Sequence, residues 1–357
     1  MIEPKPDKPL IYDLDFLGLV EIFESFGEPE YRARQIWQGL YQKLWNDPAQ
    51  FTNLPLSLRY LLDDNFQFRH LQPIQVFHSK DAETTKTLFA LPGGQPVEAV
   101  LMRYHSLRRS ICISAQSGCV MGCLFCATGQ MGFRSNLTSG EIIEQVLYYA
   151  QNLAKDDERI TNVVIMGMGE PFHNYTETLA AVDRLNHPKG FNLGARRFTI
   201  STVGLVPMIE RFTAEKRQVN LSVSLHAADN ELRSTLLPIN RKYPIDRLMK
   251  SCLNYIEATG RRISFEWALI HDINDSPQQA VALGHLLQPF RRSSSTLCHV
   301  NIIPLNPTGK YRGKATSKTR AEIFRSILEN NGIPCTLRVR RGIDIQAGCG
   351  QLAVEVK

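Results

Sequence analysis

Three cysteines stand close together in the segment Cys119-Val-Met-Gly-Cys123-Leu-Phe-Cys126. Three thiolates on one short loop can ligate three irons of a 4Fe–4S cluster, which leaves the fourth iron open to a small chelating ligand. Gly118 and Gly122 permit the backbone turns that such a loop needs. A zinc ion is the alternative, but zinc usually takes four ligands from two separated pairs, and the sequence has no second pair of this kind. The spacing therefore favours a cluster with one open iron.

The other five cysteines divide into two groups. Cys252, Cys298 and Cys335 have apolar neighbours in the sequence and are expected to pack as small hydrophobic residues. Cys349 stands between two glycines near the end of the chain, and Cys112 lies just before the triplet. From the residues alone, both are also compatible with simple packing roles, Cys112 in a strand and Cys349 as a small buried residue.

The pattern of the chain predicts the elements that position these residues. Residues 10–68 have helical spacing, and residues 70–116 form short segments rich in β-branched residues. From there to about residue 332, strands and helices alternate, which predicts parallel strands and an open (β/α) barrel of six units. The expected fold is thus α/β, a partial (β/α)6 barrel with a small all-α unit and a short β extension. The predicted domains are 1–69 (helical), 70–107 (β extension), 108–332 (barrel) and 333–357 (C-terminal strand and the loop with Cys349).

Several polar residues and glycines follow the predicted barrel strands, at the end where such barrels collect functional groups. Glycines there let the backbone approach a ligand, and a carboxylate can hold an ammonium group. A strand-end Ser or Asn is also common as a turn residue, and a lone His as a structural residue. The candidates are Gly169, Glu170, Ser201, Ser224, Leu225, His226 and Asn306.

The charge of the chain is unevenly distributed. Its formal net charge is +6, while the stretch from Lys310 to Arg341 alone has nine basic and two acidic residues. Such a concentration is typical of a surface that binds an acidic polymer such as RNA, although a solvated basic face has the same composition. No window approaches about 18 unbroken apolar residues, and the first residues do not have the basic start and apolar run of a secretory signal. We therefore expect a cytoplasmic protein.

The motifs taken together resemble a known family. The CxxxCxxC loop after the first barrel strand is similar to that of the radical S-adenosylmethionine (SAM) superfamily. Other segments resemble the RNA adenine methyltransferases of the RlmN/Cfr family, and the similarity covers nearly the whole chain. These segments are SAQSGCVMGCLFCATGQMGF, ITNVVIMGMGEP, ARRFTISTVG, SVSLHAADNELR, LLPINRKYPI, HVNIIPLNP and RGIDIQAGCGQL. The resemblance implies a 4Fe–4S cluster on Cys119, Cys123 and Cys126, SAM on its open iron, and SAM contacts at the strand-end candidates.

The resemblance also implies a reaction. Cys349 takes a methyl group from one SAM, and a second SAM supplies a 5′-deoxyadenosyl radical that activates this methyl for addition to adenine. Cys112 then helps to release the adduct through a transient disulfide with Cys349, and Glu98 is the proton acceptor. From the residues alone, Glu98 is also compatible with an outward-facing position on a half-exposed strand.

The implied partners are 23S rRNA near the peptidyl-transferase centre, the anticodon loop of tRNA, and an electron donor such as flavodoxin or ferredoxin. The helical unit is implied to be an accessory RNA-binding domain, and the enzyme a monomer without a membrane contact. Methylation at carbon 2, as in RlmN, is favoured over carbon 8, as in Cfr: Pro171 and Arg341 look RlmN-like and Ile343 looks Cfr-like. Gln346 and Gly348 depart from the usual family pattern around Cys349.

Two further alternatives remain open at this point. One is an RNA-binding protein with a structural Fe–S or zinc centre and no turnover, which would have no need of an open metal position. The other is a methylthiotransferase, but such enzymes have a second cysteine triplet, and the first 111 residues contain no cysteine.

Overall fold

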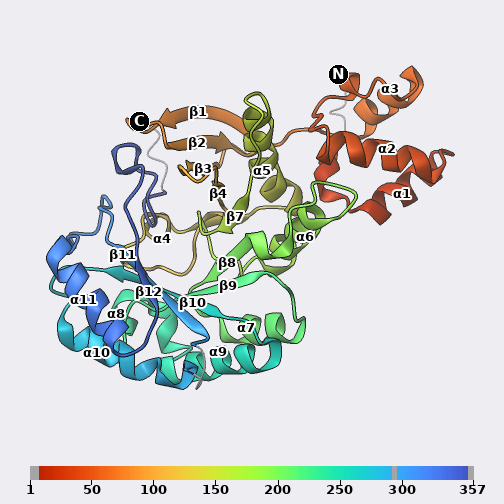
Figure 1. Cartoon of the computed structure of the whole chain (residues 1–357). Coiled ribbons are helices and arrows are strands. Elements are labelled where there is room, and N and C mark those ends of the chain that lie inside the picture. The colour runs from red at the N-terminus through yellow and green to blue at the C-terminus, as the bar shows by residue number, and fades with distance from the viewer. Residues whose placement is uncertain (1–7, 292–295, 353–357) are drawn as a thin grey trace.

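The computed structural model describes residues 8–291 and 296–352 (Figure 1). Residues 1–7 of the predicted helical domain and 353–357 of the predicted C-terminal segment lie outside the described residues. None of the helices in the described parts is long and apolar enough to cross a membrane.

One sheet of ten strands forms the centre of the protein, in the order β1-β2-β3-β4-β7-β8-β9-β10-β11-β12, and a separate hairpin is formed by β5 and β6. The strands are β1 (Gln72–His78), β2 (Thr84–Ala90), β3 (Pro96–Arg103), β4 (Arg109–Ile113), β5 (Gln116–Gly118), β6 (Phe133–Asn136), β7 (Asn162–Ile165), β8 (Phe198–Thr202), β9 (Asn220–Ser224), β10 (Ile263–Leu269), β11 (Cys298–Pro304) and β12 (Cys335–Leu337).

The sheet has an antiparallel part and a parallel part. Strands β1 to β4 pair antiparallel, and every pair from β4 onward is parallel, including β12 against β11. The six predicted barrel strands are β4, β7, β8, β9, β10 and β11. The mixed α/β fold with an antiparallel β extension is therefore confirmed. The domain boundaries stay predictions, because the sheet continues from β3 into β4 without a break.

Helices follow the parallel strands and cover the outer face of the sheet (Figure 1). The α-helices are α1 (Phe16–Ser25), α2 (Glu30–Tyr41), α3 (Leu56–Asn65), α4 (Ala127–Met131), α5 (Ser139–Ala154), α6 (Tyr175–Asn186), α7 (Val206–Ala214), α8 (Asn230–Leu236), α9 (Ile245–Thr259), α10 (Pro277–Leu286) and α11 (Lys318–Asn330). Helix α5 begins at a capping box in which Thr138 and Glu141 satisfy each other's backbone amides. Helix α9 ends at Gly260, whose φ of 66° is the left-handed conformation that stops a helix.

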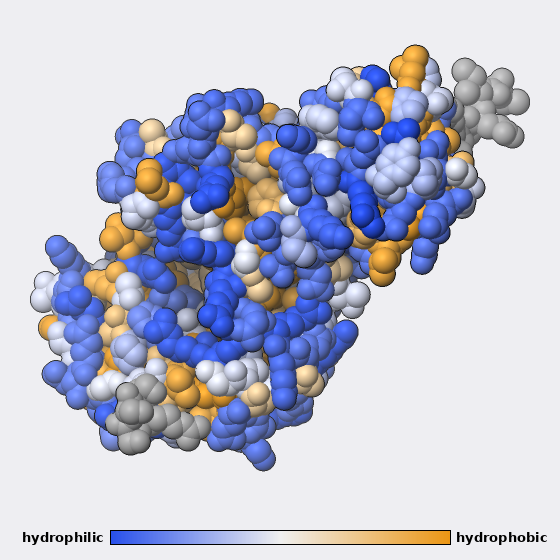
Figure 2. Space-filling model, turned by 45° about the vertical axis from the view of Figure 1, so that its right-hand side comes forward, coloured by the Kyte–Doolittle hydropathy of each residue, from blue (hydrophilic) through white to orange (hydrophobic). Residues whose placement is uncertain are grey.

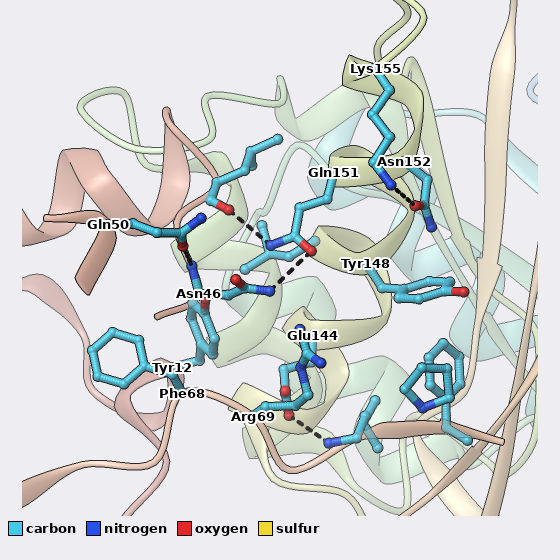
Figure 3. A pocket seen from close by; sticks show the side chains of 15 residues that line it. Tyr12, Asn46, Gln50, Phe68, Arg69, Glu144, Tyr148, Gln151, Asn152 and Lys155 are labelled. Atoms are coloured by element: carbon cyan, nitrogen blue, oxygen red, sulfur yellow. Dashed lines mark hydrogen bonds between the residues drawn. The ribbon is translucent and has the colours of Figure 1, made fainter. Parts of the chain in front are cut away.

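The helical region, α1 to α3 with their connections, forms a lobe beside the barrel, and the face of it seen in Figure 2 has hydrophobic side chains among the hydrophilic ones. The seam between this lobe and α5 encloses a cavity of about 360 Å³ (Figure 3). Amide groups tie the two sides together: Asn46 Nδ2 donates to Gln151 Oε1 (3.3 Å), and Gln151 Nε2 donates to the Leu44 carbonyl (2.8 Å). Below them, the Glu144 carboxyl group accepts the backbone N–H of His70 (3.0 Å). The seam thus fixes the lobe against the barrel through polar contacts.

Candidate active site

The three-cysteine loop lies between β5 and α4. Gly118 has a φ of +76°, and a Cβ there would lie 2.0 Å from the Gly132 carbonyl oxygen, so only glycine fits. The Cys119 amide donates to this same carbonyl (2.9 Å), and the Leu124 amide donates to the Leu236 carbonyl (3.0 Å). The hairpin and the α8 end therefore hold the loop from two sides.

The donor set of the loop bears on the two kinds of centre considered for it. Cys119, Cys123 and Cys126 all line one cavity. A structural zinc ion takes four protein ligands, whereas in a 4Fe–4S cluster each thiolate binds a different iron, so three thiolates leave one iron open. Three thiolates that face a cavity therefore fit the cluster.

The loop faces a cavity of about 180 Å³ at the C-terminal ends of the parallel strands. Most of the residues singled out from the sequence line this one cavity: Cys119, Cys123, Cys126, Gly169, Glu170, Ser201, Ser224, His226, Asn306 and Cys349. Three others, Leu225, Cys112 and Glu98, do not line it. The fold thus brings residues from five strand ends and from the chain end to one place.

Gly169 and Glu170 follow β7. Gly169 has a φ of +95°, and a Cβ there would lie 2.5 Å from the Gln116 side chain. The Glu170 carboxylate accepts the amides of Val203 (2.8 Å) and Phe172 (3.0 Å), and its burial raises its pKa to about 7. A buried carboxyl group fixed in this way is suited to hold a ligand's ammonium group, which would favour the ionised form.

His226 and Leu225 follow β9 and have different surroundings. His226 Nδ1 accepts the Ala268 amide (2.8 Å), and burial lowers the pKa of the imidazole to about 3, so the ring is neutral and carries its proton on Nε2. The Leu225 side chain is buried in the core, and its carbonyl accepts from Arg233 Nε (3.2 Å). Leu225 can therefore offer the site only its backbone.

The loop that carries Cys349 is tied to the cluster loop and to the end of β11. The Ala127 amide donates to the Gly350 carbonyl (2.8 Å), and the Thr128 hydroxyl donates to the Leu352 carbonyl (2.5 Å). Asn306 Nδ2 donates to the Cys349 carbonyl (3.0 Å). In this structure Asn306, which the resemblance placed in the SAM site, therefore also positions the Cys349 loop.

The position of Gly348 has no room for a larger side chain. A Cβ at this residue would lie 2.5 Å from Asn306 Nδ2 and 2.7 Å from Gln351 Oε1. The departure from the family pattern noted in the sequence thus gives Asn306 room to reach the Cys349 carbonyl. For Gln346, which has a φ of 53°, the structure shows an exposed left-handed residue whose side chain makes no bond to the site.

Cys112 and Cys349 lie near each other, on β4 and on the C-terminal loop. Cys112 packs in a small apolar cluster with Ala347, two residues before Cys349, and Leu352, three residues after it. Burial raises the pKa of the Cys112 thiol, and the neighbouring Cys349 raises it further. Cys349 retains exposed surface, but the surrounding protein raises its pKa to about 11, chiefly by burial and then through the Glu266 carboxylate. All eight cysteines are free thiols in this structure, so the implied disulfide is not present.

Glu98 is not an outward-facing residue. Its side chain is buried on β3, and Oε1 forms an ion pair with Lys86 Nζ at 2.8 Å. The simple alternative of a half-exposed strand position is therefore wrong for Glu98.

Two buried charged residues of the site were missed by the sequence analysis. Glu266 on β10 lines the cavity, and Ser222 Oγ (2.5 Å) and Asn301 Nδ2 (2.7 Å) both donate to its Oε1. Arg233 on α8 donates to the carbonyls of Val203 (2.8 Å) and Ser224 (3.0 Å), which fixes the ends of β8 and β9. In the sequence, Glu266 stands in an otherwise apolar strand segment and Arg233 stands in one of the motif segments. Neither position alone indicates a role, because the groups that each residue contacts are distant in sequence.

The basic segment from Lys310 to Arg341 is partly neutralised. Arg320 forms an ion pair with Asp275 (2.7 Å), and Arg341 forms one with Glu83. Arg338 and Arg340 are exposed, and neither forms an ion pair with any described residue. Arg338 is close enough to the cavity to lower the pKa of Glu266 and of Cys349, against the rise that burial causes. A polyanion bound by this segment would meet both arginines at the surface.

Comparison with known proteins agrees with the fold and the site. The radical SAM superfamily matches residues 113–283, and the ribosomal RNA large subunit methyltransferase N-terminal domain matches residues 11–67. A probable dual-specificity RNA methyltransferase RlmN from Chloroflexus aurantiacus is 48% identical, over 96% of this chain and 92% of its own. The dual-specificity RNA methyltransferase RlmN 1 from Myxococcus xanthus is 42% identical, over 99% and 97%. The crystal structure of a radical SAM methyltransferase from Sphaerobacter thermophilus has a TM-score of 0.92 and 46% identity, over 96% of this chain and 98% of that one.

The fold, the three-cysteine loop and the cavity at the strand ends define a radical SAM protein. Radical SAM proteins use a 4Fe–4S cluster and SAM. Within this class, the chain belongs to the RlmN family of dual-specificity RNA methyltransferases. The resemblance inferred from the motifs is thus confirmed over nearly the whole chain.

Proposed function

We propose that this enzyme methylates carbon 2 of adenine in 23S rRNA and in the anticodon loop of tRNA, through an S-methylcysteine at Cys349. The proposal rests on the family membership and, above all, on one observation: Cys349 lines the same cavity as the three-cysteine loop, although it lies at the other end of the barrel sequence. A nucleophile held beside the SAM site is what a protein-bound methyl intermediate requires.

The residues have separate roles in this proposal. Cys119, Cys123 and Cys126 hold the cluster, and Gly169, Glu170, Ser201, Ser224, Leu225, His226 and Asn306 contact SAM. When bound, the cluster supplies one electron to SAM, whose cleavage provides the radical chemistry. Cys349 accepts the methyl group and becomes joined to the base, Cys112 forms a transient disulfide with Cys349 as the adduct is released, and Glu98 accepts a proton.

The further partners are also part of the proposal. Two SAM molecules are used in each turnover, one as methyl donor and one as radical source. An external donor such as flavodoxin or ferredoxin supplies the electron, and the helical region contributes to RNA binding. The enzyme acts as a monomer in the cytoplasm.

The test uses the purified, cluster-loaded enzyme with rRNA and tRNA under reducing, anaerobic conditions. Mass spectrometry of the digested RNA should show 2-methyladenosine, and finding 8-methyladenosine would indicate Cfr-type chemistry instead. Cys349→Ala should gain no methyl group and form no RNA adduct. Cys112→Ala should accumulate protein joined to RNA, seen on a denaturing gel as a slow band that collapses on nuclease treatment. Normal turnover by Cys112→Ala would contradict the S-methylcysteine route.

A further inference from the structure

The sheet face beneath the C-terminal loop carries an ion pair that the roles above do not explain. Lys86 is opposite Val100 in the β2–β3 pair, and Val100 is opposite Cys112 in the β3–β4 pair. Residues opposite each other share a face, and so do residues two apart on one strand. Lys86, Glu98 and Cys112 therefore all lie on the same face of the sheet, on three adjacent strands.

The C-terminal segment covers this face. A Cβ on Gly342 would lie 2.8 Å from Thr84 Cγ2, which shows how closely the segment approaches β2. Further along, Ala347 and Leu352 pack in the apolar cluster that contains Val100. The loop that presents Cys349 thus covers this face.

Lys86 contacts both the candidate base and this loop. Its Nζ lies 2.8 Å from Glu98 Oε1, with the two side chains 6% and 3% exposed, and it donates to the Gln346 carbonyl at 3.4 Å. The ammonium group also lies 5.1 Å from the centre of the Phe77 ring. Leaving one member of a buried ion pair without its partner is strongly unfavourable, so each of these charges stabilises the other.

Other titratable groups surround the pair. From β4 the Cys112 thiol faces it, and the C-terminal segment contributes the Cys349 thiol and the Asp344 carboxylate, which accepts the Lys80 amide (2.9 Å). Tyr149 of α5 donates instead to the Ala99 carbonyl (2.8 Å), from the opposite face of the sheet. Helix α4 contributes the apolar Met131. Lys86 is therefore a cation in direct contact with Glu98 on this face.

We propose that Lys86 is a positioning residue for the reaction. Its ammonium group holds Glu98 as a carboxylate, ready to accept a proton, and its bond to the Gln346 carbonyl fixes this carboxylate relative to the loop of Cys349. This inference rests on the proposed function, in which Glu98 is the proton acceptor after the methyl carbon has joined the base. Methyl transfer to Cys349, which precedes that step, does not require Lys86.

Lys86→Met and Lys86→Arg test this role in the full-length, cluster-loaded enzyme. Lys86→Met should still cleave SAM and carry an S-methyl group on Cys349, but release of methylated adenine should slow at least ~10-fold, as for loss of a proton acceptor. Without the ammonium group the buried carboxylate holds its proton more tightly, so the acid limb of the rate profile should move to higher pH. Lys86→Arg keeps the positive charge and should return the acid limb of the pH–rate profile to its wild-type position.

Two controls separate this role from a structural one. Lys80→Met makes the same chemical change at an exposed residue and should leave rate and pH profile unchanged. If Lys86→Met alone fails to fold, the double variant Glu98→Gln/Lys86→Met removes both buried charges and is compared with Glu98→Gln, which keeps the Lys86 ammonium group. The double variant should be no slower than Glu98→Gln alone, and a further loss would overturn the inference.

The outcomes also separate this inference from the proposed function. If wild-type enzyme forms neither S-methyl-Cys349 nor methyladenosine, the proposed function fails. If wild-type enzyme forms both, and Lys86→Met matches its rate and its acid limb, only the role of Lys86 fails.

Discussion

The two cysteine loops of the site differ in how the chain holds them. The cluster loop lies between β5 and α4, and neighbouring elements such as the Gly132 turn fix its backbone. The Cys349 loop reaches the same cavity from the chain end and is fixed by distant residues, among them Thr128, which is 224 residues from its partner Leu352. One loop is thus positioned locally, and the other only after the whole barrel has formed.

This difference has a consequence for the chemistry. Two of the bonds that hold the Cys349 loop, from the Ala127 amide and the Thr128 hydroxyl, come from the residues that directly follow Cys126. The position of the nucleophile therefore depends on the cluster loop, while the cluster loop has its own local supports. Variants in the two loops should accordingly have unequal and separable effects.

The largest effect is expected from the cluster loop. Replacing Cys119, Cys123 or Cys126 by alanine removes one of three thiolate ligands, so the cluster and all SAM cleavage should be lost. Iron and sulfide content and the formation of 5′-deoxyadenosine measure this. Cys335→Ala, a cysteine that lies outside the cavity, should retain both. Full iron and sulfide content in a triplet variant would contradict the assignment.

A smaller effect is expected when only the Cys349 loop is loosened. Thr128→Val removes the hydroxyl that donates to the Leu352 carbonyl, at a cost of about 1–3 kcal/mol for a buried bond left unmade. Cluster content should stay normal, while product formation falls several-fold and alkylation of Cys349 becomes faster. Thr213→Val removes a comparable hydroxyl, bonded to Ile209 within α7, and should change neither. If Thr128→Val lost as much of its cluster as a variant of Cys119, Cys123 or Cys126, the positions of the two loops would not be independent.

RNA affinity should fall when charges that lie outside both cysteine loops are reversed. Arg338 and Arg340 are exposed cations without ion pairs among the described residues, so charge reversal at both should reduce RNA affinity several-fold and leave SAM binding intact. The log–log salt slope should fall by roughly 0.7–0.9 for each phosphate that the variant no longer neutralises. Arg262→Glu, at the opposite end of the barrel strands, is the matched control. An unchanged affinity and slope would show that the segment is only a solvated face.

The same contrast explains what the sequence could predict. The cysteine spacing and the strand–helix alternation are local patterns, and they predicted the cluster loop and the barrel strands, while the family resemblance implied the remaining site residues. The burial of Glu98, its pairing with Lys86 and the place of Glu266 depend on strands that meet only through the sheet register. No local pattern marks them. Asn306 was predicted as a strand-end residue, but its bond to Cys349 joins two segments whose approach the sequence does not specify.

The smallest effect on catalysis is expected at the seam of the helical region, which lies outside both loops. Burial raises the pKa of Glu144 from 4.5 to about 8, although the amides of His70 and Leu71 oppose this rise. The folded protein therefore keeps a proton that the unfolded chain releases above about pH 4.5, so this group lowers stability progressively between pH 4.5 and about pH 8. Glu144→Gln cannot ionise and lacks this pH dependence.

The stability of Glu144→Gln relative to wild type should thus rise with pH. Its free energy of unfolding minus that of wild type should be larger at pH 8 than at pH 5. Chemical unfolding of the full-length enzyme at both pH values measures it, with the exposed Glu24→Gln as control. Because Glu144 is remote from the cavity, SAM cleavage at a fixed pH should not change. A difference that is equal at pH 5 and pH 8 would mean that Glu144 is already ionised in the folded seam, held as a carboxylate by the two amides and Arg69.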